Sequence, residues 1–465
     1  MSEAKRRIPG RSMGLKLLLV CGLAALMSVV ALFVFLLLND RTNRAREVVS
    51  EVGGLVGGPQ TFLGPVVAVP YLIPAADPKA PPSRGVEVIY PTEGRAEVSA
   101  KSEVRKRSLF KVPVYVAKLG FTAQFDLTDA VAEAPQGAQL DWSRAELMVG
   151  ASDARGAQSD VVLKSGVVTL PVAPASAFSE IAVSTSVESK PIRDPSGDGS
   201  LKFFGAGAPG IIMPGAKFGV TAAMTFSGAE RIAVLAYAKT TTLSIKSDWP
   251  HPSFDGGFLP ATRTVNPEGF SANWSVPFIA RGVPAQGSSD TLSRLGQTAL
   301  GVSFIEPANP YQSVARSLKY APLFLGLVFL AYFMFEVSQN RRVHAAQYVL
   351  IGLAQIVFYL LLLSIAERVG FDGAFLVAAG ATVGLISTYA GWVFESRKQG
   401  LVALAAFTLL YGLIYVLMRL EDLALLVGAL ASFTAIAAVM YFTRRIDWYG
   451  APSPDPVTSN SKDAD

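Results

Sequence analysis

Six apolar stretches constrain the fold of this chain more than any other feature of its sequence. Each approaches the roughly 20 residues that an α-helix needs to cross the hydrocarbon core of a bilayer. The composition agrees, because only 17% of the 465 residues are charged, against about 25% in soluble domains. The sequence therefore predicts six transmembrane helices, one N-terminal and five C-terminal. The stretches cover residues 15–38, 321–337, 348–365, 371–394, 401–418 and 423–442.

The first apolar stretch predicts an uncleaved anchor and not a signal peptide. Its apolar core runs over 15–38, whereas the apolar region of a signal peptide has about 7–15 residues. It ends in Leu38-Asn39-Asp40, without the small residues that precede a cleavage site. We therefore expect this span to persist in the mature protein.

Basic residues near the spans predict the orientation, because cytoplasmic loops carry an excess of lysine and arginine. Two of the short connections carry only Arg368 and Arg419. The other basic residues precede the first span, follow the last, or lie in the remaining short connections. We therefore predict cytoplasmic termini at 1–14 and 443–465, with anionic lipid at the cytoplasmic face as a partner. These basic residues are Lys5, Arg6, Arg7, Arg11, Lys16, Arg341, Arg342, Arg397, Lys398, Arg444 and Arg445.

This topology places residues 39–320 outside the cytoplasm as one long region, followed by a five-helix bundle at 321–442. Apolar residues alternate with polar or small ones over 115–125 and over 270–276, which predicts half-buried β-strands. Frequent proline and glycine favour a sandwich over a βαβ fold. The predicted fold class is an α+β membrane protein with a β-rich, sandwich-like outer domain. We expect residues 41–52 to continue the first span as a helix, and 191–200 is a candidate divide between two subdomains.

The counts of cysteine and histidine exclude several kinds of site. The chain contains one cysteine, Cys21, and two histidines, His251 and His344. An intramolecular disulfide needs two cysteines, and a Cys/His zinc site needs more ligands than these. The net charge of +5 is too small to indicate a nucleic-acid partner. We expect no cofactor, no metal site and no nucleic acid.

Several long motifs follow one another along the chain. The C-terminal part holds "RRVHAAQYVLIGLAQIVFYLLLLSIAERVGF", "AGATVGLISTY", "LLYGLIYVLMRLEDLALLVG" and "YFTRRIDWYG". The outer region holds "GGPQTFLGPVVAVPY", "LFKVPVYVAKLGFTAQF", "SDARG" and "SDWPHPSFDGGFLP". With these motifs the chain resembles the CreD-type inner-membrane proteins over nearly its whole length. The resemblance implies one N-terminal span, a large periplasmic domain, a C-terminal membrane bundle, and a role in cell-envelope integrity with expression tied to a two-component system. It implies no catalytic residues.

The segment 247–254 is the most unusual part of the outer region. It sets His251 between two prolines and beside two aromatic residues, Trp249 and Phe254, with Asp248 before them. One interpretation is a periplasmic contact loop that binds a partner or responds to pH through the imidazole. The other is structural, with proline fixing a turn and the two aromatic rings capping a sheet. A Ser-His-Asp triad is disfavoured, because three residues within so short a segment do not converge easily.

A second candidate site is the basic run Arg105-Lys106-Arg107, which precedes a predicted strand. Such a run can contact an anion, for example the phosphate of a lipid headgroup or of lipopolysaccharide. The simpler interpretation is a solvated strand end.

Acidic residues lie near the ends of the predicted spans and not at their centres. There Arg368 and Arg419 can neutralise them, whereas acids deep in the membrane would indicate ion coupling. Gln355 alone is deep, and one amide usually joins helices by hydrogen bonds. The signal for a transporter is therefore weak. The acidic residues are Glu336, Glu367, Glu395, Glu421 and Asp422.

The sequence thus favours a non-enzymatic multi-pass inner-membrane protein that supports envelope integrity and stress tolerance through its periplasmic domain. Its partner there would be an envelope protein or lipid. The alternative is a transporter or a protein that handles lipids or other envelope components. An enzyme is the third possibility, and a clustered acid, base and nucleophile would have favoured it.

Overall fold

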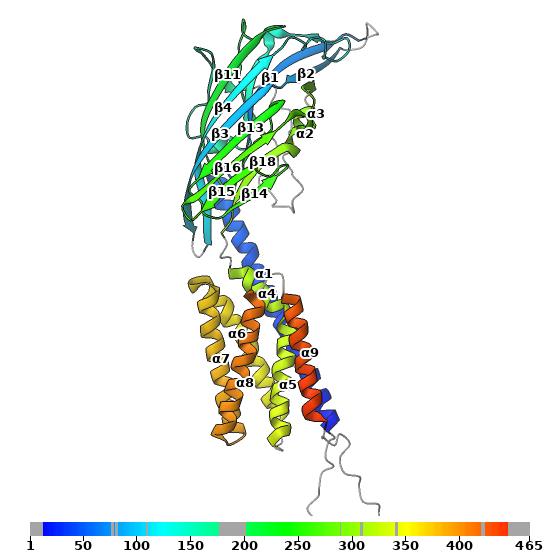
Figure 1. The fold of residues 1–465 in the computed structure, drawn as a ribbon, viewed down its shortest axis with the longest axis vertical. Helices are drawn as coiled ribbons and strands as arrows, with labels where there is room; N and C mark the ends of the chain where they lie inside the picture. The colour runs from blue at the N-terminus through cyan, green and yellow to red at the C-terminus, as the bar shows by residue number, and fades with distance from the viewer. Residues whose placement is uncertain are drawn as a thin grey trace, which may run out of the picture. The chain divides into compact units, whose positions relative to one another are not determined.

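The computed structural model of the chain describes residues 13–75, 79, 82–107, 110–175, 201–288, 290–306, 310–339, 343–419 and 424–444. The chain divides into two compact units, a β-rich unit over Arg44–Pro307 and a helical unit formed by Met1–Asn43 with Ala308–Asp465 (Figure 1). The candidate divide at 191–200 lies outside the described residues, as do the tail beyond 444 and the basic residues before 13.

Two β-sheets form the β-rich unit over its described residues. The larger has ten strands, in the order β14-β18-β12-β1-β6-β10-β9, with β2 and β5 also paired to β1 and β17 paired to β2. The smaller has eight strands, in the order β15-β16-β13-β3-β4-β11-β7-β8. Most neighbours are antiparallel, but β1 pairs with β12 and β3 pairs with β13 in parallel.

The strands have the following bounds. The ten-stranded sheet contains β1 Gln60–Ile73, β2 Ser83–Ile89, β5 Gln139–Leu140, β6 Glu146–Ala151, β9 Ala173–Pro174, β10 Lys202–Gly207, β12 Arg231–Leu235, β14 Pro252–Gly256, β17 Gln286–Ser288 and β18 Ala299–Phe304. The eight-stranded sheet contains β3 Glu93–Arg107, β4 Phe110–Asp126, β7 Val162–Ser165, β8 Val168–Leu170, β11 Lys217–Ala229, β13 Thr240–Ser247, β15 Thr262–Asn266 and β16 Gly269–Val276.

The two sheets share one hydrophobic core, which makes the unit a sandwich. Along β4 every second residue from Ala117 to Phe125 is buried and those between are exposed, so one face of the smaller sheet packs inward. The ring of Phe121 on β4 meets Tyr237, which follows β12, at 5.7 Å between centroids. The predicted strands at 115–125 and 270–276 are confirmed as parts of β4 and β16.

Tyr237 lies between the sheets in a space that glycine creates. An added Cβ at Gly64 on β1 would lie 2.6 Å from the ring, and one at Gly94 on β3 would lie 2.8 Å from it. No side chain approaches that closely without displacing its neighbour. The hydroxyl of Tyr237 donates a hydrogen bond of 2.9 Å to the carbonyl oxygen of Thr122, so the ring is fixed at its polar end as well.

Seven helices of ten residues or more, among the described residues, lie in or reach the helical unit. The first, α1, continues from the first apolar stretch as far as Leu55, which confirms the helix predicted over 41–52. Within the β-rich unit, Val49 and Val52 of this helix pack against Val112, Val114 and Ala229. The bounds are α1 Met13–Leu55, α4 Pro310–Lys319, α5 Ala321–Gln339, α6 Ala345–Val369, α7 Phe371–Val393, α8 Arg397–Arg419 and α9 Ala424–Thr443; the short helices α2 Phe278–Arg281 and α3 Asp290–Leu295 belong to the β-rich unit.

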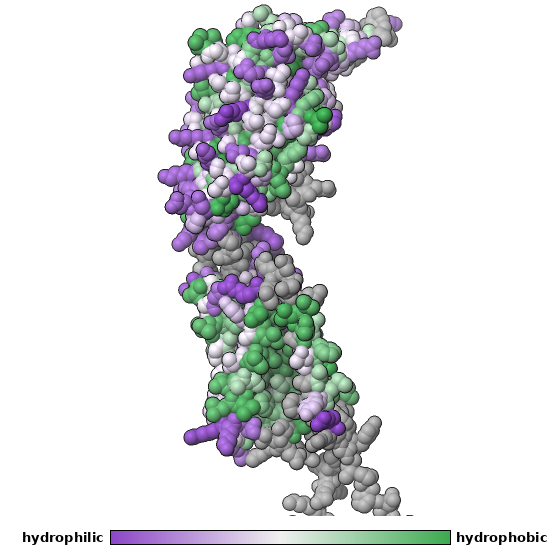
Figure 2. All heavy atoms as spheres, in the orientation of Figure 1, coloured by the Kyte–Doolittle hydropathy of each residue, from purple (hydrophilic) through white to green (hydrophobic). Residues whose placement is uncertain are grey.

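Four helices among the described residues, α1, α6, α7 and α8, are long and apolar enough to cross a membrane. The pair α4 and α5 is bent by 55° and makes a fifth candidate if it is one span. Figure 2 shows apolar side chains over the helical unit and mainly polar ones over the β-rich unit. The helix α9 coincides with the last predicted stretch, and the count of six spans stays a prediction.

Candidate functional site

The segment 247–254 carries the chain from the smaller sheet to the larger one, because β13 ends at Ser247 and β14 begins at Pro252. The side chain of Trp249 lies in the core, with only 7% of the residue exposed. Its ring meets Phe304 edge-on at 6.0 Å. Its indole N–H donates to the carbonyl oxygens of His251 and Ile305, each at 3.1 Å. Trp249 therefore holds the connection between β13 and β14 against the end of β18.

The other residues of this segment also serve the fold, except for the imidazole. Phe254 is half-buried against Phe270 and Trp274, at 5.8 and 6.0 Å between ring centroids. The carboxylate of Asp248 accepts hydrogen bonds from the amide and hydroxyl of Ser102 at 2.7 and 2.6 Å. The two rings fit the structural interpretation of this segment, because both pack against the core. His251 is exposed and is the part of the segment best placed for a contact.

Arg105, Lys106 and Arg107 lie at the end of β3, where β4 pairs antiparallel with it. Lys111 of β4 stands opposite Lys106, so four exposed cations gather at the end of one hairpin. We call these four residues the basic hairpin. Arg107 forms an ion pair of 2.7 Å with Glu51 of α1, and Lys111 forms one of 2.6 Å with Glu306. Among the described residues Arg105 and Lys106 have no acidic partner.

Sequence reasoning missed a buried arginine, Arg281, at the end of α2. The residue is only 3% exposed, and its three guanidinium nitrogens make no hydrogen bond to any described residue. The guanidinium lies over the ring of Tyr90 at 4.2 Å from the centroid. Burial lowers the pKa of Arg281 to about 10 and raises the pKa of Tyr90 to about 12, so at neutral pH the arginine is charged and the tyrosine is neutral.

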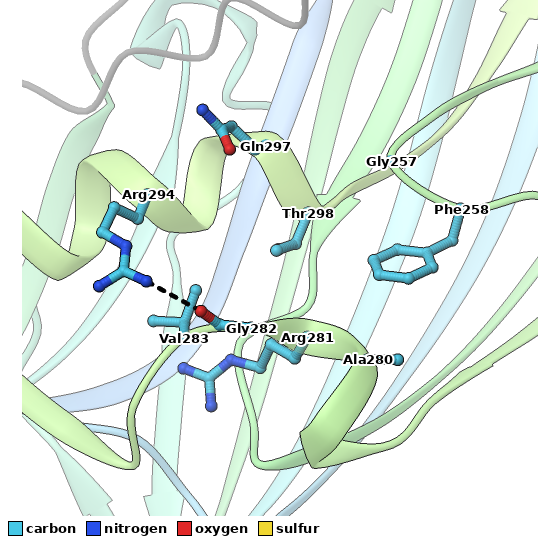
Figure 3. A pocket seen from close by; sticks show the side chains of 9 residues that line it. All are labelled: Gly257, Phe258, Ala280, Arg281, Gly282, Val283, Arg294, Gln297 and Thr298. Atoms are coloured by element: carbon cyan, nitrogen blue, oxygen red, sulfur yellow. Dashed lines mark hydrogen bonds between the residues drawn. The ribbon is translucent and has the colours of Figure 1, made fainter.

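Arg281 lines a pocket of about 240 Å³ (Figure 3). The pocket is also lined by Phe258, Val283, Arg294, Gln297 and Thr298. Arg294 of α3 donates a hydrogen bond of 3.0 Å to the carbonyl oxygen of Gly282. The two arginines therefore bring positive charge to one pocket. No sequence signal marks it, because its walls come from the segment after β14, from α2 and the residues after it, and from α3 and the turn after it. An arginine in a short helix is also normally solvated.

Two carboxyl groups lie at the core of the β-rich unit, that of Glu87 buried and that of Glu146 partly buried. Glu87 on β2 is only 1% exposed, and neither carboxyl oxygen has a hydrogen-bond partner among the described residues. Burial, together with the negative charge of Glu133, raises the pKa of Glu87 to about 7. Burial also raises the pKa of Glu146 on β6. Glu87 therefore titrates near neutral pH.

In the helical unit, Glu336 of α5 is buried and is paired with Lys16 of α1. Its carboxylate also accepts hydrogen bonds from the Tyr348 hydroxyl at 2.8 Å and from the amide of Val343 at 2.9 Å. The expectation that Arg368 or Arg419 neutralises this acid is wrong, because a lysine from the N-terminal helix does so.

Two further acids near span ends, Glu367 and Asp372, have partners within the helical unit. Arg419 pairs with Asp372 at 2.6 Å, and Glu367 accepts a hydrogen bond of 3.0 Å from the hydroxyl of Tyr311. Glu421 and Asp422 lie outside the described residues.

Gln355 of α6 is fully buried, but neither its amide nitrogen nor its oxygen finds a hydrogen-bond partner among the described residues. The prediction that this amide joins helices is therefore wrong for the described part of the bundle. The hydroxyls of Tyr359, Ser387 and Tyr411 are likewise buried there without a partner. Within the described ranges no group of three or more His, Cys, Asp or Glu side chains could hold a metal ion.

Comparison with known proteins agrees with this architecture of apolar helices and a β-rich unit. The family model described as "Inner membrane protein CreD" matches residues 12–449. A curated relative, "Inner membrane protein CreD" of Escherichia coli (strain K12), is 27% identical over 458 residues, covering 96% of this chain and 95% of the relative. Among solved structures, an M1 zinc metallopeptidase from Deinococcus radiodurans aligns with 81% of this chain and 97% of its own, at 8% identity and a TM-score of 0.22. A TM-score that low does not indicate a shared fold. The chain belongs to the CreD family of inner membrane proteins.

Proposed function

We propose that this inner-membrane protein supports cell-envelope integrity and stress tolerance by contact and not by catalysis. In this proposal the chain crosses the membrane six times with both termini in the cytoplasm, and the β-rich unit lies in the periplasm. Its partners are anionic lipid at the cytoplasmic face and an envelope lipid or protein at the periplasmic face.

The basic hairpin carries this proposal. Its ion pair between Arg107 and Glu51 holds the hairpin against α1. Arg105 and Lys106 are exposed and have no acidic partner among the described residues, so they are available for phosphate groups. The hairpin thus replaces the segment 247–254 as the best-supported contact site.

The test is detergent sensitivity in a strain that lacks this protein and is complemented with variants. The variant Arg105→Ser/Lys106→Ser should protect only partially, because it removes the two cations that lack acidic partners and leaves the ion pair to Glu51. The matched control is Lys118→Ser/Lys246→Ser, which removes two exposed cations elsewhere on the same sheet. Membrane abundance must be equal, because loss of folding imitates loss of function. Full protection by the hairpin variant would contradict the proposed contact.

A transporter or a lipid-handling protein is the alternative, and the buried polar groups of the bundle favour it. Polar side chains inside a membrane bundle often mark a substrate pathway, and Gln355, Tyr359 and Tyr411 are buried without hydrogen-bond partners among the described residues. The variant Gln355→Leu separates the two functions. It should preserve protection if the protein acts by periplasmic contact, and it should abolish protection at equal abundance if solute or lipid moves through the bundle.

The six-span topology has its own test by reporter fusions. Fusions after Val52 and Tyr311 should report a periplasmic position, and fusions after Asn340 and Asp447 a cytoplasmic one. A cytoplasmic signal at Tyr311 would overturn both the six-span count and the periplasmic placement of the β-rich unit.

A further inference from the structure

We propose that the pocket containing Arg281 binds the oxyanion group, a phosphate or a carboxylate, of an amphipathic ligand. This site is independent of the contact made by the basic hairpin. It goes beyond the proposed function, since it gives the β-rich unit a specific ligand of its own.

The guanidinium of Arg281 is the group that would bind the oxyanion. A buried charge is unfavourable unless a counter-charge or hydrogen bonds compensate for it, and none of its three nitrogens has a hydrogen-bond partner among the described residues. The ring of Tyr90 compensates in part, because the guanidinium lies over its face at 4.2 Å. Stacking uses the face of the guanidinium and leaves the N–H groups at its edge unused. A planar fork of N–H donors matches the oxygens of a phosphate or a carboxylate.

The rest of the pocket favours a negative ligand. Arg294 supplies a second positive charge, and its hydrogen bond to the carbonyl oxygen of Gly282 holds it at the pocket that Arg281 lines. Figure 3 shows both guanidinium groups at the same side of the pocket. Thr298 contributes no free donor, because its hydroxyl already donates to Leu295 and accepts from the amide of Ala236. The two arginines therefore set the charge of the ligand.

The surroundings of the pocket indicate an apolar portion on that ligand. Phe258 lines it, and the next residue, Leu259, is 70% exposed. On α2, Ile279 is 94% exposed and lies next to Ala280, another lining residue. Each of these side chains leaves apolar surface exposed one residue away from a lining residue, where an apolar group of the ligand can pack. A volume of about 240 Å³ admits an oxyanion with a short apolar group.

The test uses the full-length protein in nanodiscs of zwitterionic lipid, titrated with butyl phosphate by calorimetry. Butyl phosphate should bind, and Arg281→Met should weaken its binding about tenfold or more, the loss expected for a charge-assisted hydrogen-bonded pair. Arg281→Lys, which keeps the charge but not the planar fork, should also weaken binding. The matched control is Arg263→Met, which removes an exposed arginine that also lies over an aromatic ring, that of Phe254. This control should bind as the unaltered protein does.

Further ligands distinguish the chemistry. Inorganic phosphate should bind more weakly than butyl phosphate, and equal affinities would overturn the apolar part of the proposal. Comparing butyrate with butyl phosphate identifies whether a carboxylate or a phosphate is the preferred group, and butanol should not bind.

Thermal unfolding distinguishes a loss of ligand binding from a loss of stability in the Arg281 variants. Without ligand, Arg281→Met should unfold at a higher temperature than the unaltered protein, because it removes an uncompensated buried charge. A lower unfolding temperature, together with unchanged butyl phosphate binding, would show that the arginine is structural. The same conclusion follows if butyl phosphate does not bind the unaltered protein at millimolar concentration.

Discussion

At the scale of single residues, the protein keeps ionisable groups in places where the fold offers them no partner. Glu87 is the clearest case, because it is buried in the β-rich unit with both carboxyl oxygens unpaired among the described residues. A carboxyl group whose pKa is raised by folding holds its proton more tightly in the folded state. Its contribution to stability is therefore complete at low pH and is lost as the pH rises toward the folded-state value.

The pH dependence of thermal unfolding tests this assignment. The pKa of Glu87 rises from 4.5 to about 7 on folding, so the unfolding temperature should fall as the pH rises from about 5 to 8. Glu87→Gln cannot ionise and should flatten that fall, unfolding several degrees above the unaltered protein at pH 8. The exposed Glu268 provides the control, and Glu268→Gln should leave the profile unchanged. An equal decline in Glu87→Gln would assign the pH dependence to another group.

At the scale of elements, the close approach of the two sheets depends on small residues at chosen positions. Gly64 on β1 and Gly94 on β3 leave room for the ring of Tyr237, which bridges the space between the sheets. An extra methyl group in so tight a space displaces either the ring or the backbone.

Gly64→Ala should therefore destabilise the β-rich unit by about 1–3 kcal/mol, seen as a lower unfolding temperature of the full-length protein. The control is Gly120→Ala on β4, where an added Cβ meets no atom within 4 Å. That substitution should be neutral or slightly stabilising, because alanine restricts the unfolded chain more than glycine does. Similar losses of stability from both substitutions would mean that crowding of the Tyr237 ring is not the cause of the destabilisation.

The elements also show what sequence can and cannot predict. Alternation predicted β4 and β16, because each presents one face to the core. The first ten residues of β1 are all buried, so this strand shows no alternation, and its parallel neighbour β12 lies too far along the chain for a local pattern to reveal. The same limit hid Arg281, whose burial depends on Tyr90 and on Phe258 from other elements. For Trp249 the sequence left two interpretations open, because turn residues specify the bend but not the side to which a ring points, and the structure agrees with the structural one.

At the scale of the whole molecule, the helical unit joins the N-terminal helix to helices that follow the β-rich unit in the sequence. The ion pair of Lys16 with Glu336 connects α1 to α5. The two partners are not equally buried, since the side chain of Lys16 is 25% exposed and that of Glu336 is 3% exposed. Removing one partner leaves the other charge uncompensated, and the cost depends on how deeply the remaining charge is buried.

Lys16→Met should therefore destabilise the helical unit more than Glu336→Gln does, by about 2–4 kcal/mol, because it leaves the deeper charge unpaired. The double variant Lys16→Met/Glu336→Gln should recover most of the loss. Thermal unfolding in detergent measures all three, with Arg368→Met as a control at an exposed position on α6. Additive losses in the double variant would mean that the two side chains do not interact.

The parallel pairing of β1 with β12 has a consequence for how the chain is made. Phe62 pairs with Val234, so synthesis must continue for roughly 170 residues before β1 acquires this neighbour. An unpaired strand edge in an unfinished sheet invites pairing with other chains, and such distant contacts form slowly. During biogenesis the edge of β1 that pairs with β12 therefore stays unpaired until β12 has been synthesised. A factor that shields nascent chains would raise the yield of folded protein without binding the folded protein itself.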